Sequence, residues 1–317
     1  MAGRTLDFEE YIGTPDSLAK AIVTRYRDYD RYRDTWVEEK KELRNYIFAT
    51  DTTKTTNSSL PWKNSTTIPK LTQIRDNLHA NYMAALFPNE DWMLWEGDDE
   101  DSEAEAKRKV ITAYMKNKLR QSNFINDVSR LVYDFIDYGN VFATTEYINE
   151  VRQDEETGEV YPGYVGPKIS RISPYDIVIN PTAENFELTP KIIRSIKSLG
   201  EVAADMQDHP EQGYLEKVFE KITNIRKAVA GLTSNDIHKT DGYQIDGFGS
   251  ILDYYQSGYV ELIELHGDIF DVATNTLLKN HIITIVDRTH VIRKIPNPSW
   301  RGNSIRHAGW RLRPDNL

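Results

Sequence analysis

The change of hydrophobic period at Gly139-Asn140 constrains the fold of this chain more than any other sequence feature. Before this point, apolar residues recur every three or four positions, which is typical of amphipathic helices. From Val141 to Ile148 the spacing changes to alternation, which is typical of a half-buried strand. Gly followed by Asn is also a frequent left-handed end of a helix. The sequence therefore predicts an α+β fold, with long N-terminal helices followed by mixed helices, antiparallel strands and hairpins.

Helices are predicted for most of the first half. Thr14-Pro15-Asp16 supplies a cap, a Pro in the first turn and an acid at the positive end of the helix dipole, so one long helix can run to about Phe48. Its narrow apolar stripe indicates packing against something extended or against another subunit. Further helices are expected after Pro69 and over about 101–121 and 124–138. The helix after Pro69 has its apolar residues on one side: Leu71, Ile74, Leu78, Tyr82, Ala85 and Leu86.

Strands dominate the prediction for the second half. The turn residues of 154–158 indicate a hairpin whose return strand runs from Val160 to Ile172. Other strands are expected at 177–179, 259–265, 282–286 and 290–293, and a short apolar one at 92–95. Helices are expected near 199–208, 211–231 and 247–256, and the segment 190–197 is ambiguous.

Four consecutive parts are expected along the chain. A flexible arm covers 1–14, a mainly helical part 15–140 and an α+β part 141–300. The segment 301–317 is expected to lead into a helix that is absent from this chain, because Pro314-Asp315-Asn316 before Leu317 is typical of a helix N-terminus.

Composition and motifs exclude several classes of function. The chain has no Cys, which excludes a disulfide scaffold, thiol catalysis and Cys-ligated zinc. No run of about 18 apolar residues indicates a membrane span. The formal net charge of −10 argues against a protein that coats nucleic acid. The phosphate-loop, dinucleotide, zincin and hydrolase signatures are missing as well. We therefore expect no enzyme, no catalytic residue, no cofactor and no metal.

Two clusters of acidic and His residues have a metal site as their alternative interpretation. An acidic run occupies 96–105, where a solvated loop and a helix N-terminus are the favoured interpretation. His266-Gly267-Asp268 with Asp271 is the second cluster, and turn chemistry is favoured there because Gly-Asp is a hairpin signal.

Several segments resemble tailed-phage portal proteins, in the same order along the chain. The helix-to-strand junction at 134–143 resembles the corresponding junction of that family, and 172–181 (Ile-Ser-Pro-Tyr-Asp-Ile-Val-Ile-Asn-Pro) looks like a strand of podovirus-type portals. The segments 189–194 and 296–317 are similar to a stretch before a short helix and to the approach to the first stem helix. The similarity is closest to short-tailed and crAss-like phages.

The resemblance implies a structural protein of the virion. A portal, or head-to-tail connector, is a ring, usually a dodecamer, at one vertex of the capsid, and double-stranded DNA passes through it during genome packaging and ejection. This chain would form the wing and stop before the stem, clip and crown. Its expected partners are further copies of itself, the major capsid protein, terminase, tail or adaptor proteins and DNA, with no membrane. Its expected location is the virion, and the host cytoplasm during assembly.

Candidate contact residues follow from this resemblance. The basic C-terminal stretch either pairs with acidic neighbouring subunits or contacts DNA, through Arg293, Lys294, Arg301, Arg306, Arg311 and Arg313. Aromatic residues are candidates for packing against subunits or other partners, namely Tyr26, Tyr29, Trp36, Trp62, Trp92 and Trp95. Two alternative functions stay open: another virion structural protein, such as a head–tail adaptor or a capsid-associated protein, and a metal-dependent nuclease that uses the acidic run or the His266 cluster.

Overall fold

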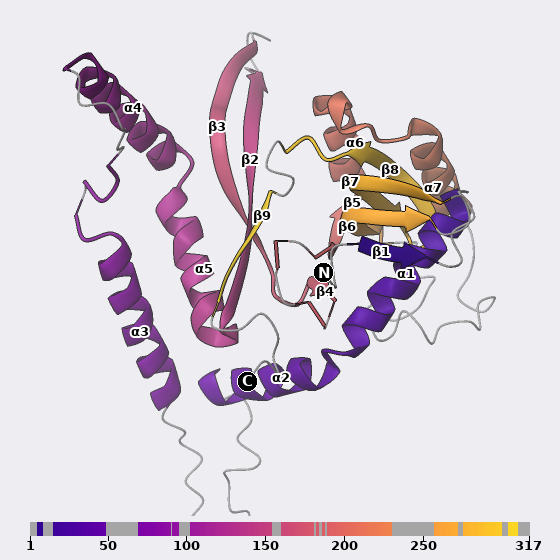
Figure 1. Ribbon diagram of the computed structural model, residues 1–317, viewed down its shortest axis with the longest axis horizontal. Helices are drawn as coiled ribbons and strands as arrows, with labels where there is room; N and C mark the ends of the chain where they lie inside the picture. Colours follow the sequence, from indigo (N-terminus) through magenta and orange to yellow (C-terminus); the bar gives the residue numbers. More distant parts are fainter. Residues whose placement is uncertain are drawn as a thin grey trace, which may run out of the picture. The chain divides into compact units, whose positions relative to one another are not determined.

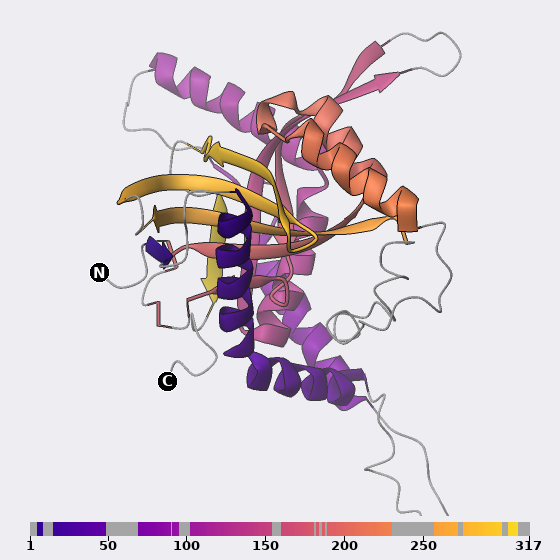
Figure 2. The same cartoon turned by 90° about the vertical axis from the view of Figure 1, so that its right-hand side faces the viewer.

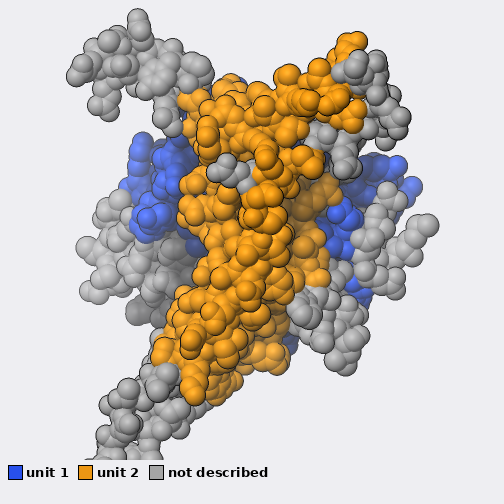
Figure 3. Space-filling view, turned by 90° about the vertical axis from the view of Figure 1, so that its left-hand side faces the viewer, with its two compact units in different colours: residues 1–32, 176–303 blue, residues 33–175, 304–317 orange. Residues whose placement is uncertain are grey.

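Segments from both halves of the chain, which Figure 1 colours from N- to C-terminus, belong to each of two units, and Figure 3 distinguishes these units by colour. Unit 1 consists of Met1–Tyr32 and Asp176–Asn303, and unit 2 of Arg33–Tyr175 and Ser304–Leu317. The sequence predicts consecutive parts instead, and the difference arises because the first helix packs on strands from the second half of the chain. The computed structural model describes residues 5–8, 15–48, 69–89, 91–94, 102–153, 160–180, 182–183, 186–187, 189–229, 257–271, 275–299 and 304–309.

Unit 1 is built around a sheet with the strand order β4-β5-β6-β7-β8. Neighbouring strands in this order are antiparallel. Helix α1 (Pro15–Arg31) covers one face, and α6 (Leu199–Asp208) and α7 (Glu216–Val229) cover the other (Figure 2). The strands are β4 (Ile177–Ile179), β5 (Lys191–Ser198), β6 (Tyr259–Asp271), β7 (Thr276–Val286) and β8 (His290–Pro296).

Alternation along β6 explains why the sheet has two apolar faces. Val260 and Leu262 belong to the core against α6 and α7, whereas Ile263 and Leu265 belong to the core against α1. Successive side chains of a strand point to opposite faces, so a strand rich in Val, Ile and Leu can serve both layers. Each fully buried side chain of this size contributes about 1.5–3 kcal/mol through burial.

The segment expected as a flexible arm contains a strand. Residues of β1 (Thr5–Phe8) pair in parallel with β6 at 268–271. Strand β5 covers the same edge of β6 only as far as His266, so the backbone groups beyond it are open to another strand. That open edge explains why residues 5–8 form a strand and not part of a flexible arm.

In its described part, unit 2 combines four helices with a three-stranded sheet of order β3-β2-β9. Strands β2 (Asn140–Gln153) and β3 (Val160–Ile172) form the predicted long hairpin, and β9 (Ile305–Gly309) pairs with 140–144 of β2 (Figure 1). Gly139 ends α5 with a φ of 74°, as its left-handed cap requires. The helices are α2 (Asp34–Phe48), α3 (Lys70–Leu86), α4 (Ser102–Gln121) and α5 (Phe124–Tyr138).

Most predicted elements are present, which confirms the α+β class. The helices after Pro69 and over 101–121 and 124–138 are α3, α4 and α5, and the helix near 199–208 is α6. The helix expected over 211–231 covers 216–229 after a 3₁₀ turn at 210–212, and the ambiguous segment 190–197 lies in strand β5. The helix expected at 247–256 and the helix start at 314–317 fall outside the described residues. In the segment 301–317, residues 305–309 form β9.

The single helix predicted from Pro15 to Phe48 is in fact two helices. It is interrupted at Tyr32 and Arg33, where the sequence has neither Gly nor Pro. The Arg33 guanidinium donates hydrogen bonds of 2.8 and 2.6 Å to the carbonyl oxygens of Pro174 and Tyr175. The break therefore coincides with a tertiary contact of Arg33 and not with a local breaker residue.

The short strand predicted at 92–95 is also wrong, since residues 92–94 are irregular. Trp92 packs on Phe87 and Phe124 instead, with ring centroids 4.9 and 5.6 Å apart. Among the helices that the structure describes, none has the length and apolar character needed to cross a membrane.

The core between α1 and the sheet can be tested at Ile22, which is fully buried. We expect Ile22→Ala to lower the free energy of unfolding by about 2–5 kcal/mol, because the substitution leaves a cavity. Thr24→Ala, at an exposed position of the same helix, is the control and changes it by less than about 0.5 kcal/mol. Urea denaturation followed by circular dichroism measures both, and equal stability of the two variants would contradict the core assignment.

Candidate functional site

Arg293, a predicted DNA- or subunit-facing residue, lies inside unit 1. Its side chain is buried and forms an ion pair with Glu264. It also donates hydrogen bonds of 2.9 Å to Thr284 Oγ1 and to Gln212 Oε1, and its guanidinium lies 4.9 Å from the centroid of the Tyr214 ring. The prediction of an outward-facing Arg293 is therefore wrong, because a polar network of the sheet already satisfies this guanidinium.

The other basic candidates are distributed differently. Lys294 is exposed on β8, and Arg306 is exposed on β9. Arg301, Arg311 and Arg313 lie outside the described residues. Whether Lys294 and Arg306 face DNA or a subunit stays a prediction.

Glu264 is the acidic centre of the Arg293 network. Burial alone would raise its pKa, but His266, Arg293 and Thr284 outweigh it and hold the pKa of this carboxyl well below its usual range. The Nε2 atom of His266 lies 2.5 Å from Glu264 Oε1. Thr284 donates a hydrogen bond of 3.0 Å to Glu264 Oε2.

The turn expected at His266-Gly267-Asp268 is wrong, because these residues lie within strand β6, at a register shift of its pairing with β7 between Gly267 and Ile269. His266 faces Glu264, while Asp268 Oδ1 accepts a hydrogen bond of 2.7 Å from the backbone N–H of Asn280. Gly267 has a φ of 148°, and a Cβ there would lie 2.8 Å from Pro190. Within the described ranges, no group of three or more His, Asp or Glu side chains is placed to hold a metal ion.

The described part of the acidic run supports helix α4. Glu103 and Glu105 form ion pairs of 2.8 Å with Lys107 and Lys109, one turn further along the helix. Acids in a first turn also interact favourably with the helix dipole. Residues 96–101 are outside the described part of the chain.

The aromatic candidates mostly stabilise the units themselves. Tyr26 and Tyr29 are buried core residues of unit 1, so the prediction that they pack against a partner is wrong. Burial also raises the pKa of Tyr29 to about 12. Trp36 is half-buried between Tyr138 and Tyr175, at centroid distances of 6.1 and 5.7 Å, and Trp92 packs as described above. Trp62 and Trp95 lie outside the described residues.

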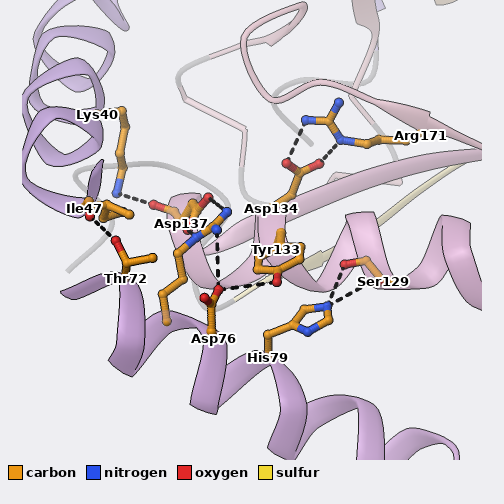
Figure 4. Close-up of polar contacts among 11 residues, drawn as sticks. Lys40, Ile47, Thr72, Asp76, His79, Ser129, Tyr133, Asp134, Asp137 and Arg171 are labelled. Carbon is orange, nitrogen blue, oxygen red and sulfur yellow. Dashed lines mark hydrogen bonds and ion pairs between the residues drawn. The ribbon is translucent and has the colours of Figure 1, made fainter. Parts of the chain in front are cut away.

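The richest polar cluster joins α3 to α5 in unit 2 (Figure 4). Arg75 binds Asp137 at two points, with Nε–Oδ1 and Nη2–Oδ2 distances of 2.6 Å. Its guanidinium also lies 4.1 Å from the centroid of the Tyr133 ring. His79 stacks on the same ring at 3.9 Å and forms a 2.9 Å hydrogen bond with Ser129 Oγ. We call these five residues the α3–α5 clamp.

A second two-point ion pair joins α5 to the hairpin. Asp134 is buried and pairs with Arg171 of β3 (Figure 4). Burial raises the pKa of Asp134, and the pairing with Arg171 opposes that rise only in part. Sequence reasoning missed both pairs, although Asp134 and Asp137 stand out as acids among the apolar residues of α5.

A cavity of about 250 Å³ lies beside the clamp. One face of α2 and one face of α5 form most of its wall, and α3 and β3 add one Arg each. The lining residues are Lys40, Leu43, Arg44, Ile47, Phe48, Arg75, Arg130, Tyr133, Asp134, Asp137, Tyr138 and Arg171.

The clamp fixes the orientation of α3 so that its apolar residues stay exposed. Thr72, Arg75 and His79 point to polar partners, including the backbone carbonyl of Ile47 for Thr72. The apolar residues predicted on one side of α3 are exposed and do not belong to the core of unit 2. We call it the α3 stripe: Leu71 (45% exposed), Ile74 (54%), Leu78 (43%), Tyr82 (37%) and Leu86 (50%).

Helix α4 carries a second outward apolar surface, here called the α4 patch. It consists of Val110 (70% exposed), Ile111 (38%) and Tyr114 (52%). Residues 110–115 contain no charge, although charged residues make up 28% of the chain. Unit 2 thus presents two separate apolar surfaces on neighbouring helices of the sequence.

The clamp can be tested by Asp137→Asn. Loss of the carboxylate removes the two-point ionic partner of the Arg75 guanidinium and leaves only the longer, 3.9 Å pair with Asp76, at a cost of about 1.5–3 kcal/mol. We expect the amides of α3 to exchange hydrogen roughly 10- to 100-fold faster. Mass spectrometry of hydrogen exchange checks this, with Asp127→Asn on the same helix as the control. Unchanged exchange in α3 would show that the clamp does not hold this helix.

The Glu264 network predicts that the free energy of unfolding decreases at acidic pH. Because the folded-state pKa of Glu264 lies below the unfolded value, its stabilisation is complete above the unfolded pKa and is lost as pH falls through the folded pKa. We expect Glu264→Gln to lower the free energy of unfolding by about 3 kcal/mol at pH 7 and to make its dependence on pH shallower below about 4.5.

Urea denaturation at a series of pH values measures this effect, with the exposed Glu220→Gln as the matched control. Some acid sensitivity remains in the variant, because burial would raise the pKa of Glu261 but Arg288 and Arg194 together outweigh it and lower the pKa of that carboxyl too. Parallel pH curves for Glu264→Gln and wild type would contradict the assignment.

No related protein was identified for this chain by its sequence. No protein-family model and no curated protein matches the chain. The assignment of a function therefore depends on the geometry of the units and on the sequence resemblance.

Proposed function

We propose that this chain is a structural subunit of a ring, the portal at the capsid vertex of a tailed phage of the short-tailed or crAss-like type. In this role it lines or supports the conduit for genome packaging and ejection, and it meets the major capsid protein, terminase and tail or adaptor proteins. The observation that carries the ring is the exposure of the α3 stripe together with the α4 patch. The resemblance of 134–143 and 172–181 to portal segments supports the specific identity.

The α3 stripe has the character of a protein interface. Helix α3 has 17 residues and is therefore about 25 Å long. The stripe includes the aromatic residue Tyr82, and aromatic residues are enriched in interface cores. A folded subunit that stayed alone would leave these side chains in water, which costs about 25 cal/mol for each Å² of apolar surface.

Two different surfaces on one chain favour a ring over a simple pair. A head-to-tail contact joins one patch of a subunit to a different patch of the next, and such contacts close into a ring when the rotation allows it. The α3 stripe and the α4 patch provide two such surfaces. A helix face of this size covers only part of the ~800 Å² that each partner of a standard interface buries. A ring satisfies this limit because every subunit is held from both sides.

A net acidic chain suits a conduit for DNA. Each phosphate that a protein neutralises adds affinity through counterion release, and affinity along the channel would act as friction. The formal net charge of −10 keeps the affinity of the protein for DNA low.

Native mass spectrometry and negative-stain electron microscopy of the full-length protein test the proposal. We expect ring-shaped oligomers, and a protein that stays monomeric at tens of micromolar would overturn it. Assembly into an open or pairwise complex would instead favour a different virion protein, such as a head–tail adaptor.

Substitutions in the α3 stripe test whether this exposed surface forms the contact between subunits. We expect Ile74→Glu with Leu78→Glu to weaken self-association by about a hundredfold or more, because two charges would be placed in an apolar contact. Gln73→Glu with Ala80→Glu adds the same two charges to exposed positions of the same helix outside the stripe and is the matched control. Rings that form equally well in both variants would exclude the stripe from the interface.

A further inference from the structure

We propose that the cavity between α2, α3 and α5 binds a phosphate group, through Lys40, Arg44 and Arg130. This site lies apart from the α3 stripe and goes beyond the proposed function, so either proposal can fail alone. The chemistry is that of a tetrahedral oxyanion, carried by a small phosphate compound or by the backbone of a nucleic acid.

An excess of positive charge around one cavity is the first observation. Among the described residues, five cationic side chains line it, against the two carboxylates of Asp134 and Asp137. Both carboxylates are already neutralised by the two-point ion pairs with Arg171 and Arg75. Three cationic side chains of the lining, Lys40, Arg44 and Arg130, therefore lie outside these two pairs, within a chain whose formal net charge is −10.

Of the three remaining cations, only Arg130 forms an ion pair with a carboxylate among the described residues, and that pair is long. The Nζ atom of Lys40 contacts only the backbone carbonyl of Asp137, at 3.5 Å. The Arg44 guanidinium lies 5.7 Å from the centroid of the Phe48 ring. The Arg130 guanidinium is 4.0 Å from Asp127, at the limit of an ion pair, and its side chain is 70% exposed. Their donors are therefore available to a ligand.

The arrangement of α2 directs this charge into the cavity. Lys40, Leu43, Arg44 and Ile47 follow helical spacing, so they share one face, and that face lines the cavity. None of the acids of α2 lines it, although the helix contains Asp34, Glu38, Glu39 and Glu42. A concave surface of one sign of charge focuses its field on an opposite charge.

Size and shape select the phosphate class. A cavity of about 250 Å³ is below the usual range for drug-sized ligands but ample for a substituted phosphate. The guanidinium forks of Arg44 and Arg130 match the oxygens of such an anion in geometry. Stacking of a nucleobase is disfavoured on Tyr133, because Arg75 and His79 already pack against its ring. The site therefore reads the phosphate and not the base.

Removal of the three charges tests the site. We expect inorganic phosphate, titrated by calorimetry at an ionic strength held constant with sodium chloride, to bind the wild-type protein saturably. Lys40→Gln/Arg44→Gln/Arg130→Gln should weaken this binding at least tenfold. The control is Lys20→Gln/Arg27→Gln/Arg31→Gln, which removes the same charges from exposed positions of α1 and should bind like the wild type. Circular dichroism verifies that both triple variants are folded.

A second titration with a 20-base-pair DNA duplex distinguishes the two sources of phosphate. Binding of inorganic phosphate alone assigns the site to small phosphate compounds, and binding of the duplex lost only in the cavity variant assigns it to a nucleic-acid backbone. Equal losses in the cavity variant and the α1 variant would mean a general charge effect and would overturn the proposal. Failure of the wild-type protein to bind either probe would overturn it as well.

Discussion

The two-point ion pair between Arg75 and Asp137 is the interaction on which the arrangement of unit 2 depends most. The pair is mostly but not fully buried, with 16% of each side chain exposed, so it lies between the weak pairs of protein surfaces and the costly pairs of dry interiors. By holding α3 through a polar face, it leaves the α3 stripe outside the core. By neutralising Asp137, it also leaves the charge of Lys40, Arg44 and Arg130 uncompensated. The apolar surface and the basic cavity of unit 2 thus have one common cause.

Local signals in the sequence were sufficient wherever local chemistry decides the structure. Gly139 ends α5 because a left-handed residue is needed there, and Ser198 begins α6 in a capping box with Glu201. Runs of Val, Ile and Leu located β4, β6, β7 and β8 of unit 1, whereas β1 and β5 were not predicted as strands. The interruption at Tyr32-Arg33 could not be predicted in this way, because it depends on carbonyl groups of Pro174 and Tyr175 that are distant in the sequence.

The site was harder to predict than the fold, because it too depends on contacts between residues that are distant in the sequence. A basic residue in a strand, such as Arg293, looks like a surface contact until Glu264 and Thr284 are seen beside it. The amphipathic pattern of α3 gave the right apolar face but not its environment, since a helix can be held by its polar side. Asp137 and Arg75 are ordinary charged residues in the sequence, and only the packing of α3 on α5 turns them into a clamp.

The pairing of β9 with β2 has a consequence for the order of folding during synthesis. Helix α5 and the β2–β3 hairpin leave the ribosome long before 305–309, and the intervening chain belongs almost entirely to unit 1. Until β9 arrives, residues 140–144 of β2 lack this strand partner, and an unpaired strand edge is a template for association with other chains. Strand β9 thus completes the sheet of unit 2 only after residues 176–303 of unit 1 have been made, so a nascent chain passes through a period in which this edge of β2 is unprotected.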